Sequence, residues 1–330
     1  MFSKSFNSLF GSSSKPFIAS AKSFFIIKCH CIDNKILAEG KKWFRRAAEQ
    51  GIEGFGEHLD SSKKIFSEIL EKAKKGNVIT QNKLGNMYYS GRGVNKNLEE
   101  AFKCYKKAAE MGYDPAKFNL GAMYENGEGV KKDLAEAIKW YIKAEKKNNI
   151  MAQNNLGVLY ATGKGVKQNF TKSFDFYKKA AEQGSKNSQN SLGFAYHKGK
   201  GVKQNFEEAV KWYKKAAEQG YTKAEFNLGF MYANGEGVKK DLVEAVKWYK
   251  KAAEKGNKDA QNNLGLAYQK GSGVEKDLTE AIKWYKKASE QGNLFAIRNL
   301  KKLKRRKVYK IIAIILFTVV LYLIFKSLKI

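Results

Sequence analysis

Acidic side chains three residues apart are the first groups in this sequence that could do chemistry. Two carboxylates can act as general acid and general base when their surroundings separate their pKa values. The same spacing is also typical of a capping box, in which Asp accepts a backbone hydrogen bond at the start of a helix. Because the pairs recur in front of similar apolar stretches, we interpret them as helix starts. The pairs are Asp133 and Glu136, Asp241 and Glu244, and Asp277 and Glu280.

Other candidate motifs lack the context that their chemistry needs. Gly-x-Gly-Val, as in Gly127–Val130, has neither the preceding strand nor the third glycine of a nucleotide-binding loop. The segment Cys29-His30-Cys31 has no second ligand pair at zinc spacing. His30, His58 and His197 have no Ser, Cys or carboxylate partner at a recognisable spacing. The sequence therefore predicts no catalytic site, no metal site and no cofactor.

These motifs belong to a unit that recurs every 36 residues. A Leu-Gly pair marks each of six copies, and Leu300 follows at the same spacing without its glycine. Units of this length build one continuous core by stacking, so chain length does not set the number of domains. The pairs are Leu84-Gly85, Leu120-Gly121, Leu156-Gly157, Leu192-Gly193, Leu228-Gly229 and Leu264-Gly265.

Each Leu-Gly segment predicts an amphipathic helix, which we name helix A. The Ala four residues before Leu and the Tyr four residues after it fall on one apolar arc of about 100°. Ala224 and Tyr232 around Leu228 are an example. The glycine lies at the edge of this arc, where a neighbouring helix can approach closely. The glycines of Gly-x-Gly-Val then end the helix with positive φ angles, and the valine fills the hairpin.

A second helix, helix B, begins at the acidic pair and carries large aromatic residues next to alanines. Gly follows helix B as expected for a left-handed residue, and Asn148 replaces it once. Cys104 occupies the column that holds Trp in other units, so we expect a buried core residue and not a nucleophile. The pattern is clearest in Ala245, Trp248-Tyr249 and Ala252-Ala253.

The unit resembles the Sel1-like repeat, a relative of the tetratricopeptide repeat. The copy from Phe226 to Gly256 matches the family pattern LGxxYxxGxGVxxDxxxAxxWYxKAAExG nearly position for position. The resemblance covers about Gln81–Asn299. It implies an all-α fold, a right-handed superhelical α-solenoid of helical hairpins that binds proteins or peptides as a scaffold. Some bacterial members have been associated with hydrolysis of β-lactams, so a hydrolase is the alternative that the resemblance leaves open.

The face of helix A opposite its apolar arc is the candidate binding surface. Positions two before, two after and five after the Leu fall between about 140° and 200°, and in a solenoid such a face lines the concave groove. Asn there could hydrogen-bond a partner backbone, and Phe could anchor it. Packing on adjacent repeats is an equal alternative for Phe194 and Phe230, which share this face with Val158 and Leu266. The predicted partner-binding residues are Asn82, Phe118, Glu125, Asn154, Asn190, His197, Phe226 and Asn262.

The N-terminal part of the chain departs from the pattern. We expect residues 1–40 to be a basic leader, either disordered or a targeting peptide, because residues 1–32 contain no acid. Residues 41–80 hold degenerate units, with Trp43–Gly51 and Ile65–Gly76 as lone copies of helix B. We interpret them as an N-terminal cap on the six repeats of residues 81–299, since a terminal unit must cover the open core.

The C-terminal part predicts a membrane anchor. Residues 300–310 form a basic juxtamembrane segment, Ile311–Phe325 is an apolar run without charge, and residues 326–330 are a tail. A 15-residue helix spans only about 22 Å, but Lys310 and Lys326 can extend outward. The positive-inside rule leaves the repeats in the cytosol, as in a tail-anchored protein of an undetermined membrane. A buried capping helix and an interfacial anchor are the alternatives. The predicted membrane-surface residues are Lys301, Lys302, Lys304, Arg305, Arg306, Lys307 and Lys310.

The formal net charge of +30 raises a further alternative, a charge-driven binder of nucleic acid or lipid. Lysines are spread over the repeats among glutamates, and arginine is scarce. An RNA-binding face would interleave Arg with exposed aromatic residues. We therefore interpret most lysines as a solvated surface and argue against a nucleic-acid partner. Binding that weakens steeply with salt would mark the alternative.

Overall fold

The computed structural model describes residues 56–327, and all regular structure in that range is α-helical. Helix A of successive repeats corresponds to α5, α7, α9, α11, α13 and α15, and helix B to the even-numbered helices α6–α16. The helices are α4 (Gly56–Lys74), α5 (Val78–Ser90), α6 (Leu98–Glu110), α7 (Asp114–Asn126), α8 (Leu134–Glu145), α9 (Ile150–Thr162), α10 (Phe170–Glu182), α11 (Lys186–Lys198), α12 (Phe206–Glu218), α13 (Thr222–Asn234), α14 (Leu242–Glu254), α15 (Lys258–Lys270), α16 (Leu278–Glu290) and α17 (Leu294–Ser327).

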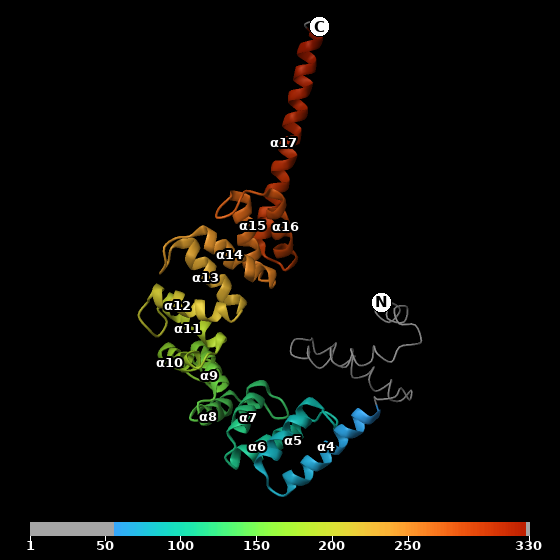
Figure 1. Cartoon of the computed structure of the whole chain (residues 1–330), viewed down its shortest axis with the longest axis vertical. Helices are drawn as coiled ribbons and strands as arrows, with labels where there is room; N and C mark the ends of the chain where they lie inside the picture. Colours follow the sequence, from blue (N-terminus) through green and yellow to red (C-terminus); the bar gives the residue numbers. More distant parts are fainter. Residues whose placement is uncertain (1–55, 328–330) are drawn as a thin grey trace. The chain divides into compact units, whose positions relative to one another are not determined.

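The chain divides into two compact units, residues 1–97 and 98–330. In the first unit α4 packs on α5, where Ala73 and Leu84 are buried and the rings of Phe66 and Tyr88 meet edge to face. In the second unit α6–α17 follow one another as stacked hairpins (Figure 1). The predicted all-α solenoid is therefore confirmed, and the hand of its curve stays a prediction. Trp43–Gly51 and Cys29-His30-Cys31 lie outside the described residues.

Each hairpin of the second unit closes where the glycine of a Leu-Gly pair meets a Tyr ring from helix B. A Cβ placed on Gly193 of α11 would lie 2.7 Å from Cδ1 of Tyr213 on α12. At four other hairpins the Cβ would come within 2.5–2.8 Å of the corresponding Tyr ring. These glycines are needed for space and not for an unusual φ angle. The four are Gly121, Gly157, Gly229 and Gly265.

The predicted caps are confirmed in part. Asp133 Oδ1 accepts hydrogen bonds from the backbone N–H groups of Ala135 and Glu136, at 2.9 and 3.0 Å. A complete capping box would also have the Glu136 side chain accept from the backbone N–H of Asp133, but this N–H donates to the carbonyl of Tyr124 at 3.0 Å. The carboxylate of Glu136 pairs with Lys139 instead. The same arrangement recurs at Asp241 with Glu244 and at Asp277 with Glu280.

The turns follow the sequence prediction and also join the repeats. Asn148 has a positive φ of 58°, as do the glycines that follow the other B helices of the second unit. In the turn after α11, Gly201 has φ 77°, and a Cβ there would lie 2.1 Å from the carbonyl oxygen of Phe170 at the start of α10. The second glycine of Gly-x-Gly-Val therefore lies against the preceding repeat. Val166 and Val238 pack on the core from such turns.

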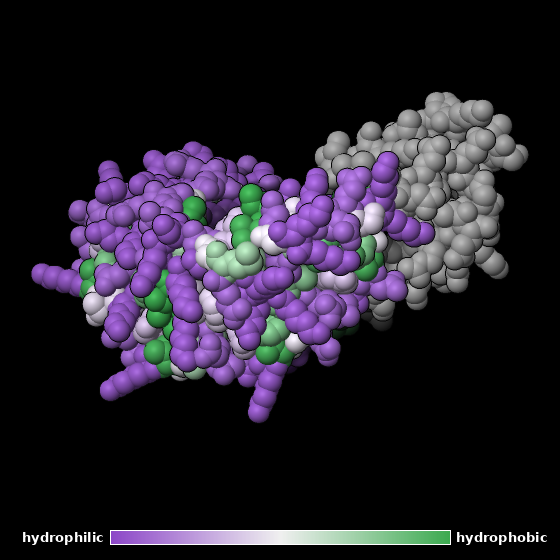
Figure 2. Space-filling model, turned by 90° about the horizontal axis from the view of Figure 1, so that it is seen from below, coloured by the Kyte–Doolittle hydropathy of each residue, from purple (hydrophilic) through white to green (hydrophobic). Residues whose placement is uncertain are grey.

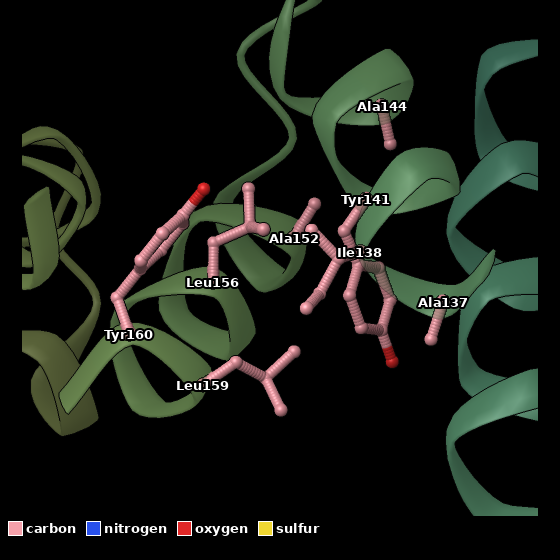
Figure 3. Packing of buried hydrophobic residues seen from close by; sticks show 8 residues of the cluster. All are labelled: Ala137, Ile138, Tyr141, Ala144, Ala152, Leu156, Leu159 and Tyr160. Carbon is pink, nitrogen blue, oxygen red and sulfur yellow. The ribbon is translucent and has the colours of Figure 1, made fainter. Parts of the chain in front are cut away.

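The core consists of small and large side chains that interlock between neighbouring repeats. Figure 3 shows one such cluster, in which Ile138 of α8 points toward Ala152 and Leu156 of α9. Leu156 and Tyr141 have no exposed surface. Cys104 is buried at 5% exposure, which confirms its prediction as a core residue. Burying a Leu side chain fully stabilises the fold by roughly 1.5–3 kcal/mol, so each repeat depends on its neighbours for cover.

The last helix, α17, begins as a seventh helix A and continues without a break to Ser327. Ala296 and Leu303 are buried against α16, whereas the described side chains of residues 311–324 are exposed. Across the residues described by the structure, no helix is both long and apolar enough to cross a bilayer. The transmembrane helix predicted at Ile311–Phe325 is therefore not confirmed.

Candidate protein-binding face

The predicted asparagines of helix A link neighbouring repeats to one another. The side chain of Asn154 on α9 accepts a hydrogen bond from Ser188 on α11 at 3.0 Å. Asn190 on α11 accepts one from Asn227 on α13 at 3.0 Å. Asn262 on α15 accepts one from Asn299 on α17 at 3.2 Å. These bonds link α9 to α11, α11 to α13 and α15 to α17 in the second unit.

This face remains partly open to solvent. Asn154, Asn190 and Asn227 are half-buried. Asn262 and Asn82 are buried, at 9% and 7% exposure, and Asn82 belongs to the first unit. The middle repeats therefore offer the most accessible amides.

An apolar column runs beside these asparagines. Val158, Phe194 and Phe230 take the same position on α9, α11 and α13 and are 40%, 42% and 36% exposed. Leu266 at the next position is half-buried and packs on the core. We call the combined surface of Asn154, Val158, Asn190, Phe194, Asn227 and Phe230 the A-helix face.

The other two predicted phenylalanines use their rings partly for packing. Phe118 lies 5.6 Å from Tyr141, and Phe226 lies 5.9 Å from Tyr249, measured between ring centroids. Both are half-buried. They support the hairpins from the edge of the face and leave Phe194 and Phe230 as its most exposed aromatic groups.

The position five residues after the Leu lies deeper and contacts the Tyr of helix B. Glu125 accepts a hydrogen bond from the hydroxyl of Tyr141 at 2.6 Å, and this hydroxyl accepts one from Asn155. Burial raises the pKa of Tyr141, and the hydrogen bond to Glu125 raises it further by a smaller amount. Glu125 therefore has a structural partner inside its own hairpin.

Tyr213 differs from Tyr141 because its buried hydroxyl has no hydrogen-bond partner among the described residues. We expect Tyr213→Phe to stabilise the protein by about 1 kcal/mol, since an unsatisfied buried hydroxyl is removed. Tyr141→Phe should destabilise it by about 1–2 kcal/mol, because Glu125 and Asn155 lose their partner. Urea unfolding midpoints of the two variants check this pair. Shifts in the same direction would contradict it.

His197 holds the turn of the next repeat. Its Nε2 lies 2.8 Å from Oε2 of Glu236, and its ring is 8% exposed among Phe206, Tyr213 and Phe230. Burial lowers the pKa of His197 below 6.5, helped by Lys198 and opposed by Glu236. A neutral ring that donates from Nε2 to the carboxylate satisfies this geometry.

This pKa shift predicts a loss of stability in acid. Protonation of His197 favours the unfolded chain because the folded-state pKa lies below the unfolded value. His197→Gln keeps a donor for Glu236 and does not titrate. The stability advantage of the native protein over this variant should therefore shrink as the pH falls below 6.5. Thermal melting of both proteins between neutral and mildly acidic pH measures it, and a growing advantage in acid would show that Glu236 dominates.

A second set of polar pairs was not predicted from the sequence, and each pair joins a buried glutamine of helix A to an exposed glutamine. Three glutamine pairs connect the first turn of helix A with the end of helix B in the same repeat, at 2.7–2.9 Å between side-chain nitrogen and oxygen. The signal was Gln recurring three residues before the Leu. The pairs are Gln153 with Gln183, Gln189 with Gln219, and Gln261 with Gln291.

Among the side chains that the structure describes, no group of three or more His, Cys, Asp or Glu residues could hold a metal ion. The polar groups of the A-helix face are amides and not acid–base pairs. Their chemistry suits hydrogen bonding to a peptide and offers no nucleophile.

The chain matches the family model described as Sel1 repeat in seven segments, which are residues 37–52, 78–113, 114–149, 150–185, 186–221, 222–257 and 258–293. It is similar to c5321, a protective antigen of uropathogenic Escherichia coli with an SLR fold, at 39% identity and a TM-score of 0.71 over 74% of this chain and 52% of that one. It is also similar to a Sel1 repeat protein from Oxalobacter formigenes, at 37% identity and a TM-score of 0.63 over 76% of this chain and 99% of that one.

A curated relative matches over a shorter stretch. The DAP3-binding cell death enhancer 1 of Rattus norvegicus is 43% identical over 60 residues, which are 18% of this chain. The match spans only 12% of that relative's length.

Proposed function

Because this chain belongs to the Sel1 repeat family, we propose that it is a non-catalytic scaffold that holds a protein partner on its A-helix face. Sel1 repeats generally mediate contacts between proteins. The observation that carries the proposal is the exposed column of Val158, Phe194 and Phe230 beside half-buried amides. Exposed aromatic residues are enriched at protein interfaces, where they supply contact area at low entropic cost.

The amides can bind the backbone of an extended segment. Asn227 uses its Nδ2 to donate to Asn190, so Nδ2 of Asn190 and Oδ1 of Asn227 have no hydrogen-bond partner among the described residues. Together they offer one donor and one acceptor, which matches the C=O and N–H groups of a peptide unit. Phe194 and Phe230 lie one helical turn away on the same two helices, where they can contact the partner's side chains.

Partner capture from cells tests this face. We expect Phe194→Ala with Phe230→Ala to reduce captured partners at least about tenfold, since interface anchors contribute roughly 1–2 kcal/mol each. Val243→Ala with Leu278→Ala is the matched control, because those side chains are 52% and 45% exposed on B helices. An unchanged partner set for the first variant, with equal folding, would remove the A-helix face from the proposal.

We further propose that the apolar part of α17 is embedded in a lipid bilayer. Ile311–Phe325 carries no charge, and Ile314, Leu316 and Phe317 are 60–64% exposed in the isolated chain. Lipid would cover this surface, and the exposed Lys301, Lys302, Lys304 and Arg305 suit anionic head groups. The side chains of Arg306, Lys307 and Lys310 lie outside the described residues. Basic residues in front of the run favour a cytosolic position for the repeats.

Flotation with phospholipid vesicles tests the anchor. Ile314→Lys with Phe317→Lys should abolish co-flotation, because a charge in the hydrocarbon region is strongly unfavourable. Leu294→Lys with Phe295→Lys is the control, since these exposed side chains precede the run. Equal flotation of both variants would exclude the anchor, and flotation only with anionic vesicles would reduce it to charge-driven attachment.

A further inference from the structure

One repeat replaces the neutral glutamine pair by an ion pair between a buried carboxylate and an exposed lysine. Glu225 on α13 stands at the glutamine position of helix A, and Lys255 stands at the corresponding end of α14. Lys255 Nζ lies 2.6 Å from Oε1 of Glu225 and 3.1 Å from the carbonyl oxygen of Gly220. Both members of the pair therefore differ from the three glutamine pairs at once.

The ion pair leaves part of the carboxylate unsatisfied. Glu225 is 2% exposed, and its Oε2 is buried without a hydrogen-bond partner among the described residues. An unpartnered atom of a buried charged group is unfavourable, whereas the glutamine pairs avoid the charge. The ammonium group of Lys255 is a compact charge that contacts only one oxygen of the carboxylate, and 43% of the Lys255 side chain is exposed. It can leave Glu225 for water at modest cost.

A recess of about 530 Å³ opens at this position. It lies between the end of α12 and the hairpin α13–α14, with Glu225 and Lys255 in its wall. Glu218, Glu254 and the indole of Trp248 also line it, and Lys251 lies 4.0 Å from the centroid of that indole. Three carboxylates and two lysines meet here on a chain whose overall charge is +30. The recess is thus a local site of net negative charge.

We propose that this recess receives the guanidinium group of an arginine side chain from a protein partner. The guanidinium displaces the ammonium of Lys255 and donates to both Oε1 and Oε2 of Glu225 as a planar fork. Lysine cannot make this bidentate contact, so arginine satisfies the oxygen that Lys255 leaves alone. Glu218 and Glu254 attract the cation, and Trp248 supplies an apolar wall for its stem. The site uses residues outside the A-helix face and does not depend on it.

Neighbouring repeats provide controls that isolate Glu225. The repeat before this one has the same residue types at the positions that line the recess, with Glu182, Trp212 and Glu218 in place of Glu218, Trp248 and Glu254. It differs only in having Gln189 and Gln219 where the ion pair stands. Glu225→Gln with Lys255→Gln therefore recreates a pair that this fold already contains, and it should fold normally. Gln189→Glu, added to that double variant, would build the site one repeat away.

The test measures binding of a blocked tripeptide, Ac-Ala-Arg-Ala-NH₂, to the full-length protein by saturation-transfer NMR. We expect the arginine tripeptide to bind at least about tenfold more tightly than the same tripeptide with citrulline or lysine in place of arginine. One charge-assisted bidentate contact can supply a difference of this size. Glu225→Gln with Lys255→Gln should lose this preference. Lys255→Gln alone should tighten binding, because the competing ammonium is gone, and Gln189→Glu should restore binding to the double variant.

Three results would overturn the proposal. One is equal binding of the arginine and citrulline tripeptides by the native protein. Another is undiminished arginine preference in the double variant, whose circular dichroism spectrum shows that it has folded. The third is free arginine binding at least about tenfold more tightly than the blocked tripeptide, which would assign the recess to a small molecule and not to a protein side chain.

Discussion

Gly201→Ala is expected to destabilise the protein by about 3 kcal/mol or more, roughly twice the effect of Gly184→Ala. Both glycines have positive φ angles, 77° and 91°. A left-handed conformation costs an alanine roughly 1–2 kcal/mol, so this term is common to both variants. Their surroundings differ. A Cβ on Gly184 meets nothing within 4 Å, whereas one on Gly201 would lie 2.1 Å from the carbonyl oxygen of Phe170.

The clash at Gly201 cannot be relieved by a side chain. The atoms in the way are backbone atoms of Phe170 and Thr171 at the start of α10, so the turn must move away from the preceding repeat. Overpacking of this kind typically adds 1–3 kcal/mol, and here it also weakens an interface between repeats. Urea unfolding, combined with amide exchange across α10 and α11, measures both effects. Equal destabilisation by Gly201→Ala and Gly184→Ala would mean that the turn does not lie on α10.

The hairpins could be predicted because their signals are local. Helix A, its glycine turn and helix B follow from the period of apolar residues and from glycines that permit a positive φ. The positive φ of Asn148 and the helix-capping role of Asp133 were predicted correctly for the same reason. The bond that would complete the capping box from Glu136 is not local in this sense, because the N–H of Asp133 donates to Tyr124, nine positions before Asp133.

The sequence predicts which side of helix A forms the candidate face, but it does not predict which residues of other repeats that side contacts. A helical wheel shows that Asn154 and Asn190 point away from the core, yet it contains no distance to the next helix. Their bonds to Ser188 and Asn227 join residues 34 and 37 positions apart. Asn227 was missed because it lies next to the predicted binding positions of helix A and is connected to them by its hydrogen bond to Asn190. Glu225 and Lys255 were missed because only the structure brings their positions together.

Gly193→Ala should be destabilising in the native protein and stabilising when Tyr213 is also changed to Ala. A Cβ on Gly193 would lie 2.7–3.1 Å from three ring carbons of Tyr213, which is fully buried. The ring cannot withdraw, because neighbouring repeats enclose it. We therefore expect Gly193→Ala alone to cost about 2–3 kcal/mol, even though alanine favours the helix by about 1 kcal/mol over glycine.

Removing the ring reverses the balance. Tyr213→Ala alone should cost about 3–5 kcal/mol through the cavity that it leaves, in line with other large aromatic truncations. In that background the new methyl group meets open space, so only the helix preference of alanine remains and the double variant should be about 1 kcal/mol more stable than Tyr213→Ala. The coupling between the two positions then amounts to roughly 3–4 kcal/mol, within reach of a double-mutant cycle in urea. If the two effects simply added, the ring of Tyr213 would not be what requires glycine after leucine, and the recurring Leu-Gly pair would need another explanation.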